Sequence, residues 1–409
     1  MSNLRIDLDR LMGRIQRLGQ VGALEGGGVC RLALTEEDKA GRDLVVGWMK
    51  ELGLEVSVDR IGNVIGVRAG EVEGPPVTTG SHIDTVATGG LYDGNLGVLA
   101  GLEVIETLNE AGVTTRHPLA VGFFTNEEGA RFAPDMMGSG VHQGALSLEA
   151  CLATEGIDGT TVGNDLVRIG YAGETPVGEF CARAFIELHV EQGPVLEEEG
   201  TEIGAVTGVQ GISWTEYSIS GVSNHAGTTP MRLRHDAGYV AAAIATFARR
   251  IARDMGGDQV ATSGVIELEP NLVNVIARRA KVTVDLRNTD ESLLQEAEQR
   301  MAARVLELAG EEGVEITARS LARFQPVDFD AGMVDLVAET AAGLGHSVRR
   351  MPSGAGHDAQ MFAPNCPAAM IFVPSKDGIS HNVREYTAPQ EIAAGANVLL
   401  RVMLSAASS

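Results

Sequence analysis

Two stretches of the chain alternate helical periodicity with short, continuous apolar runs, and this alternation limits the folds open to it. From about residue 40 to 200, helical segments separate apolar runs such as "PVTTGS", "HPLAVGFF" and "ARAFIELHV". The pattern returns after "FQPVDFD", with a helix from about 331, the run "AAMIFVP" and a last helix from about 388. Such alternation predicts an α/β domain in which helices cover a mostly parallel sheet.

Between residues 213 and 327 the order changes to strand, helix, strand, strand, helix, strand, which is the split βαβ pattern of a ferredoxin-like α+β domain. In "AKVTVDLR", the apolar Val282, Val284 and Leu286 alternate with polar residues, so one face of that strand is buried. Because 409 residues exceed one ordinary core, we expect a discontinuous catalytic domain, 1–212 with 328–409, and an inserted domain, 213–327.

Charge and cysteine content exclude several classes of partner. A formal net charge of −23 repels nucleic acid and anionic membrane surfaces. Four widely spaced cysteines without a CxxC pair argue against a disulfide framework and against a thiolate zinc site. The N-terminus predicts an amphipathic helix rather than a signal peptide, and no transmembrane stretch stands out. We therefore expect a cytoplasmic protein that binds neither nucleic acid nor membrane.

Polar residues follow the ends of four predicted strands. The positions are His82, Asp84 and Asp93 in "GSHIDTVATGGLYDGNLG", Glu127 and Glu128 in "FFTNEEG", His189 in "IELHVEQG", and His381 in "SKDGISHN". Singly, each has an ordinary explanation as a loop residue or a solvated charge. Together they suggest one site, because the carboxyl ends of strands in an open α/β sheet converge on one crevice. Histidines with carboxylates suit two borderline divalent ions such as Zn or Mn.

Spacing assigns some roles within this set and leaves one open. Asp93, in a Gly-rich turn before a helix, is the best candidate for a carboxylate that bridges two ions. Asp84, two residues after His82, is expected to accept the imidazole N–H that faces away from the metal. Consecutive glutamates diverge, so one of Glu127 and Glu128 would coordinate and the other would accept a proton from the attacking water. Spacing alone does not say which does which.

These motifs closely resemble the hydantoinase/carbamoylase family of amidohydrolases. The resemblance includes "ELHVEQGPVLE", "GVSNHAGTTPM", "NLVNVIARRAKVTVDLRN", "SGAGHDAQMFA" and "GISHNVREYT", and it runs in order over about residues 60–390. Members include N-carbamoyl-L-amino acid hydrolases, β-ureidopropionases and allantoate amidohydrolases, related to di-zinc aminoacylases and exopeptidases. The resemblance implies a di-metal exopeptidase-like catalytic domain with an inserted ferredoxin-like lid or dimerisation domain, and hence a homodimer.

The family pattern also implies a ligand set and a general base. The implied ligands are His82, Asp93 and His189 for one ion, and Asp93, Glu128 and His381 for the other. Glu127 is then the base that activates water and later protonates the leaving amine. The cofactor would be two divalent ions per subunit, and the residues do not choose among Zn, Mn, Co and Ni. The related exopeptidases usually carry a carboxylate at the position of His189, which favours a ureido amidohydrolase over a peptidase.

Residues that would bind substrate follow from the same resemblance. His225 matches a histidine that stabilises the oxyanion, and Asn274 and Arg287 match residues that hold the substrate carboxylate. A guanidinium pairs well with a carboxylate, although a surface pair between Arg287 and Asp285 is the alternative. Gln192 is a candidate contact to the ureido group. His357 and Asp358 are interpreted as structural, and Gly356 beside them as allowing close approach of the backbone to the substrate.

The expected activity is metal-dependent hydrolysis of the ureido C–N bond of an N-carbamoyl-L-amino acid, releasing the amino acid, CO2 and ammonia. Allantoate amidohydrolase and β-ureidopropionase are alternatives, and an aminoacylase or dipeptidase is disfavoured. A non-catalytic binding protein would lack a ligand or the base, and none is missing. In one departure, "PDMMGSGVHQG" stands where family members often have a segment ending in "GSR". This makes the loop 134–143, chiefly Ser139 to Gln143, a candidate for altering the pocket.

Overall fold

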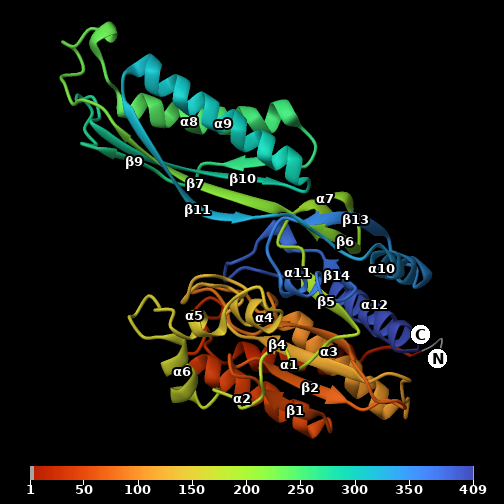
Figure 1. Cartoon of the computed structure of the whole chain (residues 1–409). Coiled ribbons are helices and arrows are strands. Elements are labelled where there is room, and N and C mark those ends of the chain that lie inside the picture. Colours follow the sequence, from red (N-terminus) through yellow and green to blue (C-terminus); the bar gives the residue numbers. More distant parts are fainter. Residues whose placement is uncertain (1–3, 409) are drawn as a thin grey trace. The chain divides into compact units, whose positions relative to one another are not determined.

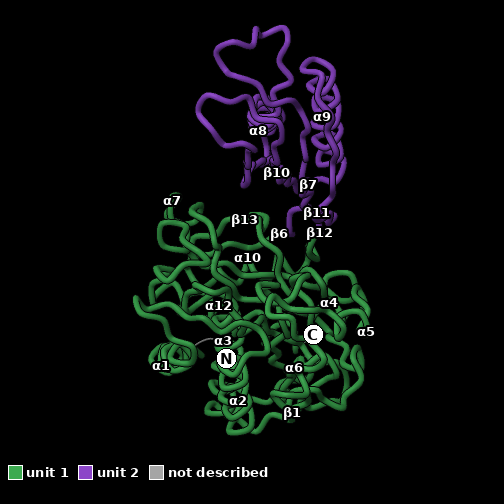
Figure 2. Tube along the Cα trace, turned by 90° about the vertical axis from the view of Figure 1, so that its left-hand side faces the viewer, with its two compact units in different colours: residues 1–207, 328–409 green, residues 208–327 purple. Residues whose placement is uncertain are grey.

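The computed structural model describes residues 4–408, which form two compact units (Figures 1 and 2). Unit 1 combines the chain up to Thr207 with the chain from Asp328, and unit 2 is Gly208–Val327. The predicted boundary at 213 falls inside the first long strand of unit 2, β7 (Gly211–Ser220). A lid or dimerisation role for unit 2 stays a prediction.

A mixed sheet forms the centre of unit 1. Nine strands of the described chain pair in the order β1, β2, β4, β3, β5, β14, β6, β12, with β13 also paired to β6. Their bounds are β1 (Glu55–Val58), β2 (Val64–Arg68), β3 (Val77–His82), β4 (Leu119–Phe124), β5 (Ala184–Val190), β6 (Ile203–Val209), β12 (Val327–Asp328), β13 (Val348–Ser353) and β14 (Ala368–Val373). The central strands β4, β3, β5 and β14 are parallel, while β1, β2 and β6 pair antiparallel. The α/β fold class is confirmed.

Helices cover this sheet (Figure 1). They are α1 (Leu8–Gly19), α2 (Glu36–Glu51), α3 (Asn95–Glu110), α4 (Met137–His142), α5 (Leu148–Leu152), α6 (Val162–Ile169), α7 (Val195–Glu199), α10 (Ala331–Gly343), α11 (Asp358–Phe362) and α12 (Pro389–Ser408), with a short 3-10 turn η2 (Lys376–Gly378). Helix α3 packs on β3, β4 and β5, and almost all of its residues are buried. A bidentate ion pair from Arg10 to Glu103, with both N···O distances 2.7 Å, ties α1 to α3.

Helix α12 is buried against the same sheet. Within residues 4–408 it is the one helix long and apolar enough to cross a membrane by length and composition. Its residues Ile392, Leu399 and Val402 are fully buried, and it packs on α3, α10 and β14. A core helix of a soluble protein has the same composition, so packing accounts for this one.

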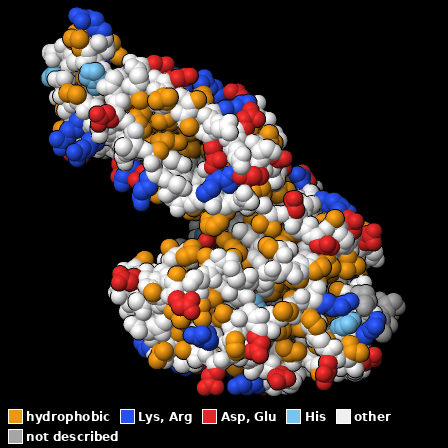
Figure 3. All heavy atoms as spheres, in the orientation of Figure 1, with side chains coloured by type: hydrophobic (Ala, Val, Ile, Leu, Met, Phe, Trp, Pro, Cys, Tyr) orange, Lys and Arg blue, Asp and Glu red, His pale blue; other side chains and the backbone are white. Residues whose placement is uncertain are grey.

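Unit 2 is an antiparallel sheet with two helices on one face (Figure 1). In the described chain its elements are β7, a 3-10 turn η1 (Met231–Leu233), α8 (Ala237–Met255), β8 (Val260–Thr262), β9 (Ile266–Glu269), β10 (Arg279–Asn288), α9 (Glu291–Glu312) and β11 (Glu315–Phe324). The predicted order is present, with β8 as an additional strand. The buried Val282, Val284 and Leu286 of β10 face α8 and α9. Apolar side chains also gather on the outer surface of these helices (Figure 3). Tyr239 of α8 and Leu306 of α9 are exposed.

Candidate metal centre

The predicted metal ligands converge at the carboxyl edge of the parallel strands in unit 1. His82 is the last residue of β3, and His189 is the last but one of β5. Glu127 and Glu128 follow β4, and His381 lies in the loop after β14. Because β4, β3, β5 and β14 are adjacent and parallel, these ends share one edge.

Asp93 belongs to two groups of possible ligands. In the first, Asp93 Oδ1 lies 3.2 Å from His189 Nε2 and 3.7 Å from His82 Nε2. In the second, His381 Nε2 lies 3.3 Å from Asp93 Oδ2 and 3.3 Å from Glu128 Oε2. Within each group the potential ligand atoms all lie within 4.8 Å of one another. The two oxygens of one carboxylate therefore face two different sets of ligands.

Backbone carbonyls set the orientation of the two buried imidazoles. His82 Nδ1 lies 2.9 Å from the carbonyl oxygen of Asp84, and His189 Nδ1 lies 2.9 Å from that of Val190. A carbonyl oxygen only accepts, so both Nδ1 atoms carry the proton and donate it. When the rings are neutral, both Nε2 atoms, which lie near Asp93 Oδ1, then offer a lone pair, as a metal ligand must.

The side chain of Asp84 does something other than predicted. Its carboxylate was expected to accept the His82 N–H, but Oδ1 lies 3.9 Å from His82 Nδ1, and the Asp84 backbone carbonyl takes that hydrogen bond instead. Asp84 Oδ1 and Oδ2 accept hydrogen bonds from the backbone N–H groups of Glu127 and Glu128, both 3.3 Å. Asp84 therefore orients His82 through its main chain and holds the turn of the two glutamates through its side chain.

Crowded carboxylates dominate the electrostatics of this edge. Burial raises the pKa of Glu128 well above its usual range, and Asp93 raises it further. Burial and neighbouring carboxylates raise the pKa of Glu127 in the same way. Burial would also raise the pKa of Asp93, but hydrogen bonds from His189 and His381 hold it well below its usual range. A cation placed among these groups would favour their charged forms and offset the cost of burying them.

The donor set fits a divalent ion at each group. Imidazole nitrogens with carboxylate oxygens are ligands that Zn and related metals share. Glu128 Oε1 is buried and has no hydrogen-bond partner among residues 4–408, which is costly for a carboxylate oxygen that nothing coordinates. These residues could therefore hold metal ions.

A small cavity adjoins these ligands, and some of its lining was missed from sequence. It measures about 110 Å³, and the residues other than ligands and base that line it are Asp135, Gln192, Ala355, Gly356 and His357. Gln192 Nε2 donates to Asp93 Oδ2 at 3.0 Å, while Gln192 Oε1 is buried without a partner in the described chain.

Glu187 was also missed in the sequence, and it forms a further group of possible ligands with His189 and His357. The sequence did carry a signal for this residue: Glu187 lies two positions before His189 on the same strand, and alternate residues of a strand share a face.

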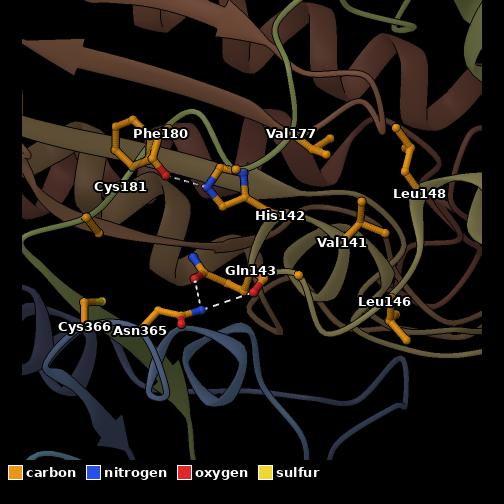
Figure 4. A pocket seen from close by; sticks show the side chains of 13 residues that line it. Val141, His142, Gln143, Leu146, Leu148, Val177, Phe180, Cys181, Asn365 and Cys366 are labelled. Atoms are coloured by element: carbon orange, nitrogen blue, oxygen red, sulfur yellow. Dashed lines mark hydrogen bonds between the residues drawn. The ribbon is translucent and has the colours of Figure 1, made fainter.

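The departing loop contributes at a different point from the one expected. Asp135 lines the cavity beside the metal ligands. Met136 packs close to Gly356, since a Cβ on Gly356 would lie 2.8 Å from Met136 Cε. Ser139 lies in α4. His142 and Gln143 instead line a separate cavity of about 540 Å³ (Figure 4). There His142 Nε2 bonds the Phe180 carbonyl at 3.0 Å, so residues 141–143 build another surface.

His225 and Asn274 lie on neighbouring exposed loops of unit 2. His225 Nδ1 accepts hydrogen bonds from the backbone N–H groups of Gly227 and Thr228, at 3.0 and 3.2 Å. In the neutral ring Nε2 must then carry the proton and act as a donor. The backbone N–H of Ala226 donates to the Asn274 carbonyl at 3.0 Å, which joins the two loops.

Arg287 lies on the face of β10 that is turned away from the helices. Its guanidinium donates to Asp285 Oδ2 at 2.9 Å and stands 5.7 Å from the ring centre of Trp214. The surface pair given as the alternative is therefore formed, and a contact between Arg287 and substrate stays a prediction.

Unit 2 does not bring Arg287 and Asn274 together. Arg279, which follows the Asn274 loop, pairs with Ser220 at one end of β10, whereas Arg287 pairs with Ile212 near the other end. The strand has ten residues, and at about 3.4 Å per residue it spans roughly 30 Å. One copy of unit 2 cannot place both side chains on one small carboxylate.

Comparison with known proteins places this geometry in context. The chain matches peptidase family M20/M25/M40 over residues 78–405. It is 39% identical to the N-carbamoyl-L-amino-acid amidohydrolase of Rhizobium meliloti, over 99% of this chain and 98% of that protein. It is 41% identical to the N-carbamoyl-L-amino acid amidohydrolase of Geobacillus stearothermophilus, over 96% of each. A hydantoinase/carbamoylase family amidase structure from Burkholderia multivorans matches with a TM-score of 0.97 at 46% identity, over 99% of each chain.

Replacing Gly94 with alanine should cost metal affinity through His82. Gly94 has φ +66°, and a Cβ there would lie 2.4 Å from the His82 ring. We expect Gly94→Ala to weaken binding of Mn²⁺ by about 10–100-fold in calorimetric titration, as loss of a ligand's support typically does. Gly112→Ala is the control, because Gly112 has φ +60° with nothing within 4 Å of its Cβ position. Equal affinities for the two variants would contradict the role given to His82.

Proposed function

The chain belongs to peptidase family M20/M25/M40 and is an amidohydrolase that acts on small molecules, and we propose that it hydrolyses the ureido C–N bond of N-carbamoyl-L-amino acids. One water and one substrate would give the free amino acid, CO2 and ammonia. The observation that carries this proposal is the position of Asp93, whose two oxygens face two groups of possible metal ligands. Glu127 lies beside these ligands but belongs to neither group. The proposal is supported by the names of two relatives, 39% and 41% identical to this chain, which are both N-carbamoyl-L-amino acid amidohydrolases.

The proposed cofactor is two divalent ions per subunit, drawn from Zn, Mn, Co and Ni. His82, Asp93 and His189 would hold one, and Asp93, Glu128 and His381 the other. When bound, such ions would polarise the ureido carbonyl and acidify a water molecule. The proposal places the enzyme in the cytoplasm, in line with its charge and thiol content.

Glu127 is the proposed proton carrier. Its Oε2 lies 3.3 Å from His82 Nε2, and the side chain lines the cavity at the ligands without belonging to either ligand group. Burial is the main cause that raises the pKa of its carboxyl, and cations bound at the adjacent ligands would favour the charged form that can accept a proton. It would take a proton from water as the C–O bond forms and deliver it to the leaving nitrogen as the C–N bond breaks.

Gln192 and His225 supply complementary polar atoms for a ureido group. Gln192 Oε1 has no hydrogen-bond partner among residues 4–408 and could accept an N–H from a ureido group. A ureido group has more N–H donors than the amide of an N-acyl amino acid. His225 Nε2 carries a proton, and we assign it to the oxyanion of the tetrahedral intermediate. Gly356, in the cavity lining, leaves room for the substrate.

The separation of Arg287 and Asn274 supports the proposal of a homodimer. If both bind the substrate carboxylate, as the family resemblance implies, they must come from two copies, because they lie at opposite ends of β10. Unit 2 offers apolar surface for such an association, with Val260 and Ile266 exposed on edge strands and Tyr239 exposed on α8.

A substrate panel tests the proposed activity. Purified protein loaded separately with Zn, Mn, Co or Ni would be assayed on N-carbamoyl-L-amino acids, N-carbamoyl-β-alanine, allantoate and N-acetyl-L-amino acids. The highest kcat/KM is expected on an N-carbamoyl-L-amino acid. A preference for allantoate or N-carbamoyl-β-alanine would keep the mechanism and change the substrate, whereas a preference for N-acetyl substrates would reject the ureido assignment.

Glu127→Gln should abolish most turnover while leaving metal content unchanged. Glutamine cannot take the proton from water, and a general base of this kind contributes about 10²–10⁴-fold to rate. Metal content measured on the same samples separates loss of the base from loss of the ions. Turnover close to wild type with both ions retained would contradict the assignment.

Mixing two inactive variants should restore activity if each site draws on two copies. His225→Ala and Glu127→Gln would each be inactive alone, but a mixed dimer has one site with both residues intact. After dissociation and reassociation of equal amounts, roughly a quarter of wild-type activity is expected from random pairing in a two-fold dimer. No recovery, with mixed dimers verified by mass spectrometry, would show that His225 acts within its own chain or not at all.

A further inference from the structure

Glu385 links the two chain segments that carry Asp93 and His381, and no sequence motif singled it out. Its side chain is only 6% exposed, although it lies in a stretch, residues 379–388, that forms no helix or strand in the described structure. Glu385 Oε1 accepts hydrogen bonds from the backbone N–H groups of Tyr92 and Asp93, both at 3.1 Å. One carboxylate oxygen therefore holds the turn from which the shared ligand projects.

The fit of this side chain requires a glycine in the facing loop. A Cβ on Gly90 would lie 2.3 Å from Glu385 Oε1 and 2.4 Å from its Cβ. Val383, two residues before Glu385, makes a second close contact, since a Cβ on Gly28 would come within 2.4 Å of Val383 Cγ1. The edge-to-face contact of Tyr92 with Tyr386, with ring centres 6.3 Å apart, adds a third. The segment after His381 is thus fixed against the Asp93 loop.

The two ligand groups differ in how their histidines are held. His82 and His189 project from central strands and are buried. His381 has a half-exposed side chain, a left-handed backbone with φ 52°, and no strand or helix around it. Its distance to Asp93 therefore depends on side-chain links such as Glu385 rather than on the sheet. The Asp93, Glu128 and His381 group should be the more sensitive of the two to loss of such a link.

We propose that Glu385 is a positioning residue that fixes His381 relative to Asp93 and so sets the affinity of the Asp93, Glu128 and His381 group for its ion. Glu385 belongs to neither ligand group, so its effect is indirect. The inference rests on the two-ion function proposed above. Glutamine at this position keeps an oxygen for the two N–H groups, whereas alanine removes it.

The test is a titration of metal-free protein with Mn²⁺ alone, followed by calorimetry and by metal analysis after gel filtration. Wild type should bind two ions per chain. Glu385→Ala should weaken binding of the second ion by about 10–100-fold, as for other supports of ligands, and binding of the first ion by a smaller factor, because Asp93 belongs to both groups. Glu385→Gln should restore most of the second affinity. Neither readout depends on turnover.

Two further variants keep the result interpretable. Glu391→Ala is the matched control, because Glu391 Oε2 accepts a backbone N–H from Ala388 at 2.8 Å and Glu391 belongs to neither ligand group, so its loss should leave both affinities unchanged. Gly90→Ala should displace Glu385 and weaken the second ion, yet add little in the Glu385→Ala background. If Glu385→Ala is poorly stable, Gly90→Ala and Glu385→Gln, each measured alone, still test the inference.

Other results would overturn the inference. Two ions bound by Glu385→Ala with wild-type affinities, or an equal loss of both ions, would reject a selective role for Glu385. Wild-type protein that binds fewer than two ions would instead reject the two-ion function, and the inference with it.

Discussion

The candidate metal centre depends on the carboxylate of Asp93, because its two oxygens face two sets of ligands. The sheet positions only part of these ligands, and His381 comes from a loop. His82 and His189 reach Oδ1 from adjacent parallel strands, while His381 reaches Oδ2 from a loop. Such an arrangement buries several carboxylates together, and burial raises the pKa of two of them. The electrostatic cost of this cluster is the physical reason to expect cations there.

Much of the fold and of the ligand set could be predicted because both follow from patterns that a single sequence records. Apolar runs between helical segments predicted the strands, and parallel strands place their carboxyl ends together, so polar residues after four runs predicted one site. The strand β6 was not predicted, although its run "IGAVTGV" contains the strand formers Ile, Val and Thr, because its two glycines weaken the pattern. The roles of Glu127 and Glu128 came from family resemblance, since adjacent side chains carry no spacing signal.

Contacts to the backbone were the least predictable part of the site. Asp84 and Glu385 each hold two consecutive N–H groups of a turn that carries a ligand. Any residue supplies such N–H groups, so neither partner nor spacing marks the contact in the sequence. The error over Asp84 has this cause: proximity to His82 suggested an imidazole contact, while folding placed the carboxylate on another turn.

The distribution of residues between strands and loops suggests how substrate range could change without loss of the metal chemistry. His82 and His189 are held by the central sheet, whose geometry tolerates little change. His225 and Asn274 lie on exposed loops of unit 2, whose orientation depends on local hydrogen bonds. Loops accept substitution and insertion far more readily than packed strands. If His225 and Asn274 contact substrate as proposed, changes in these two loops would alter substrate preference and leave the metal ligands in place.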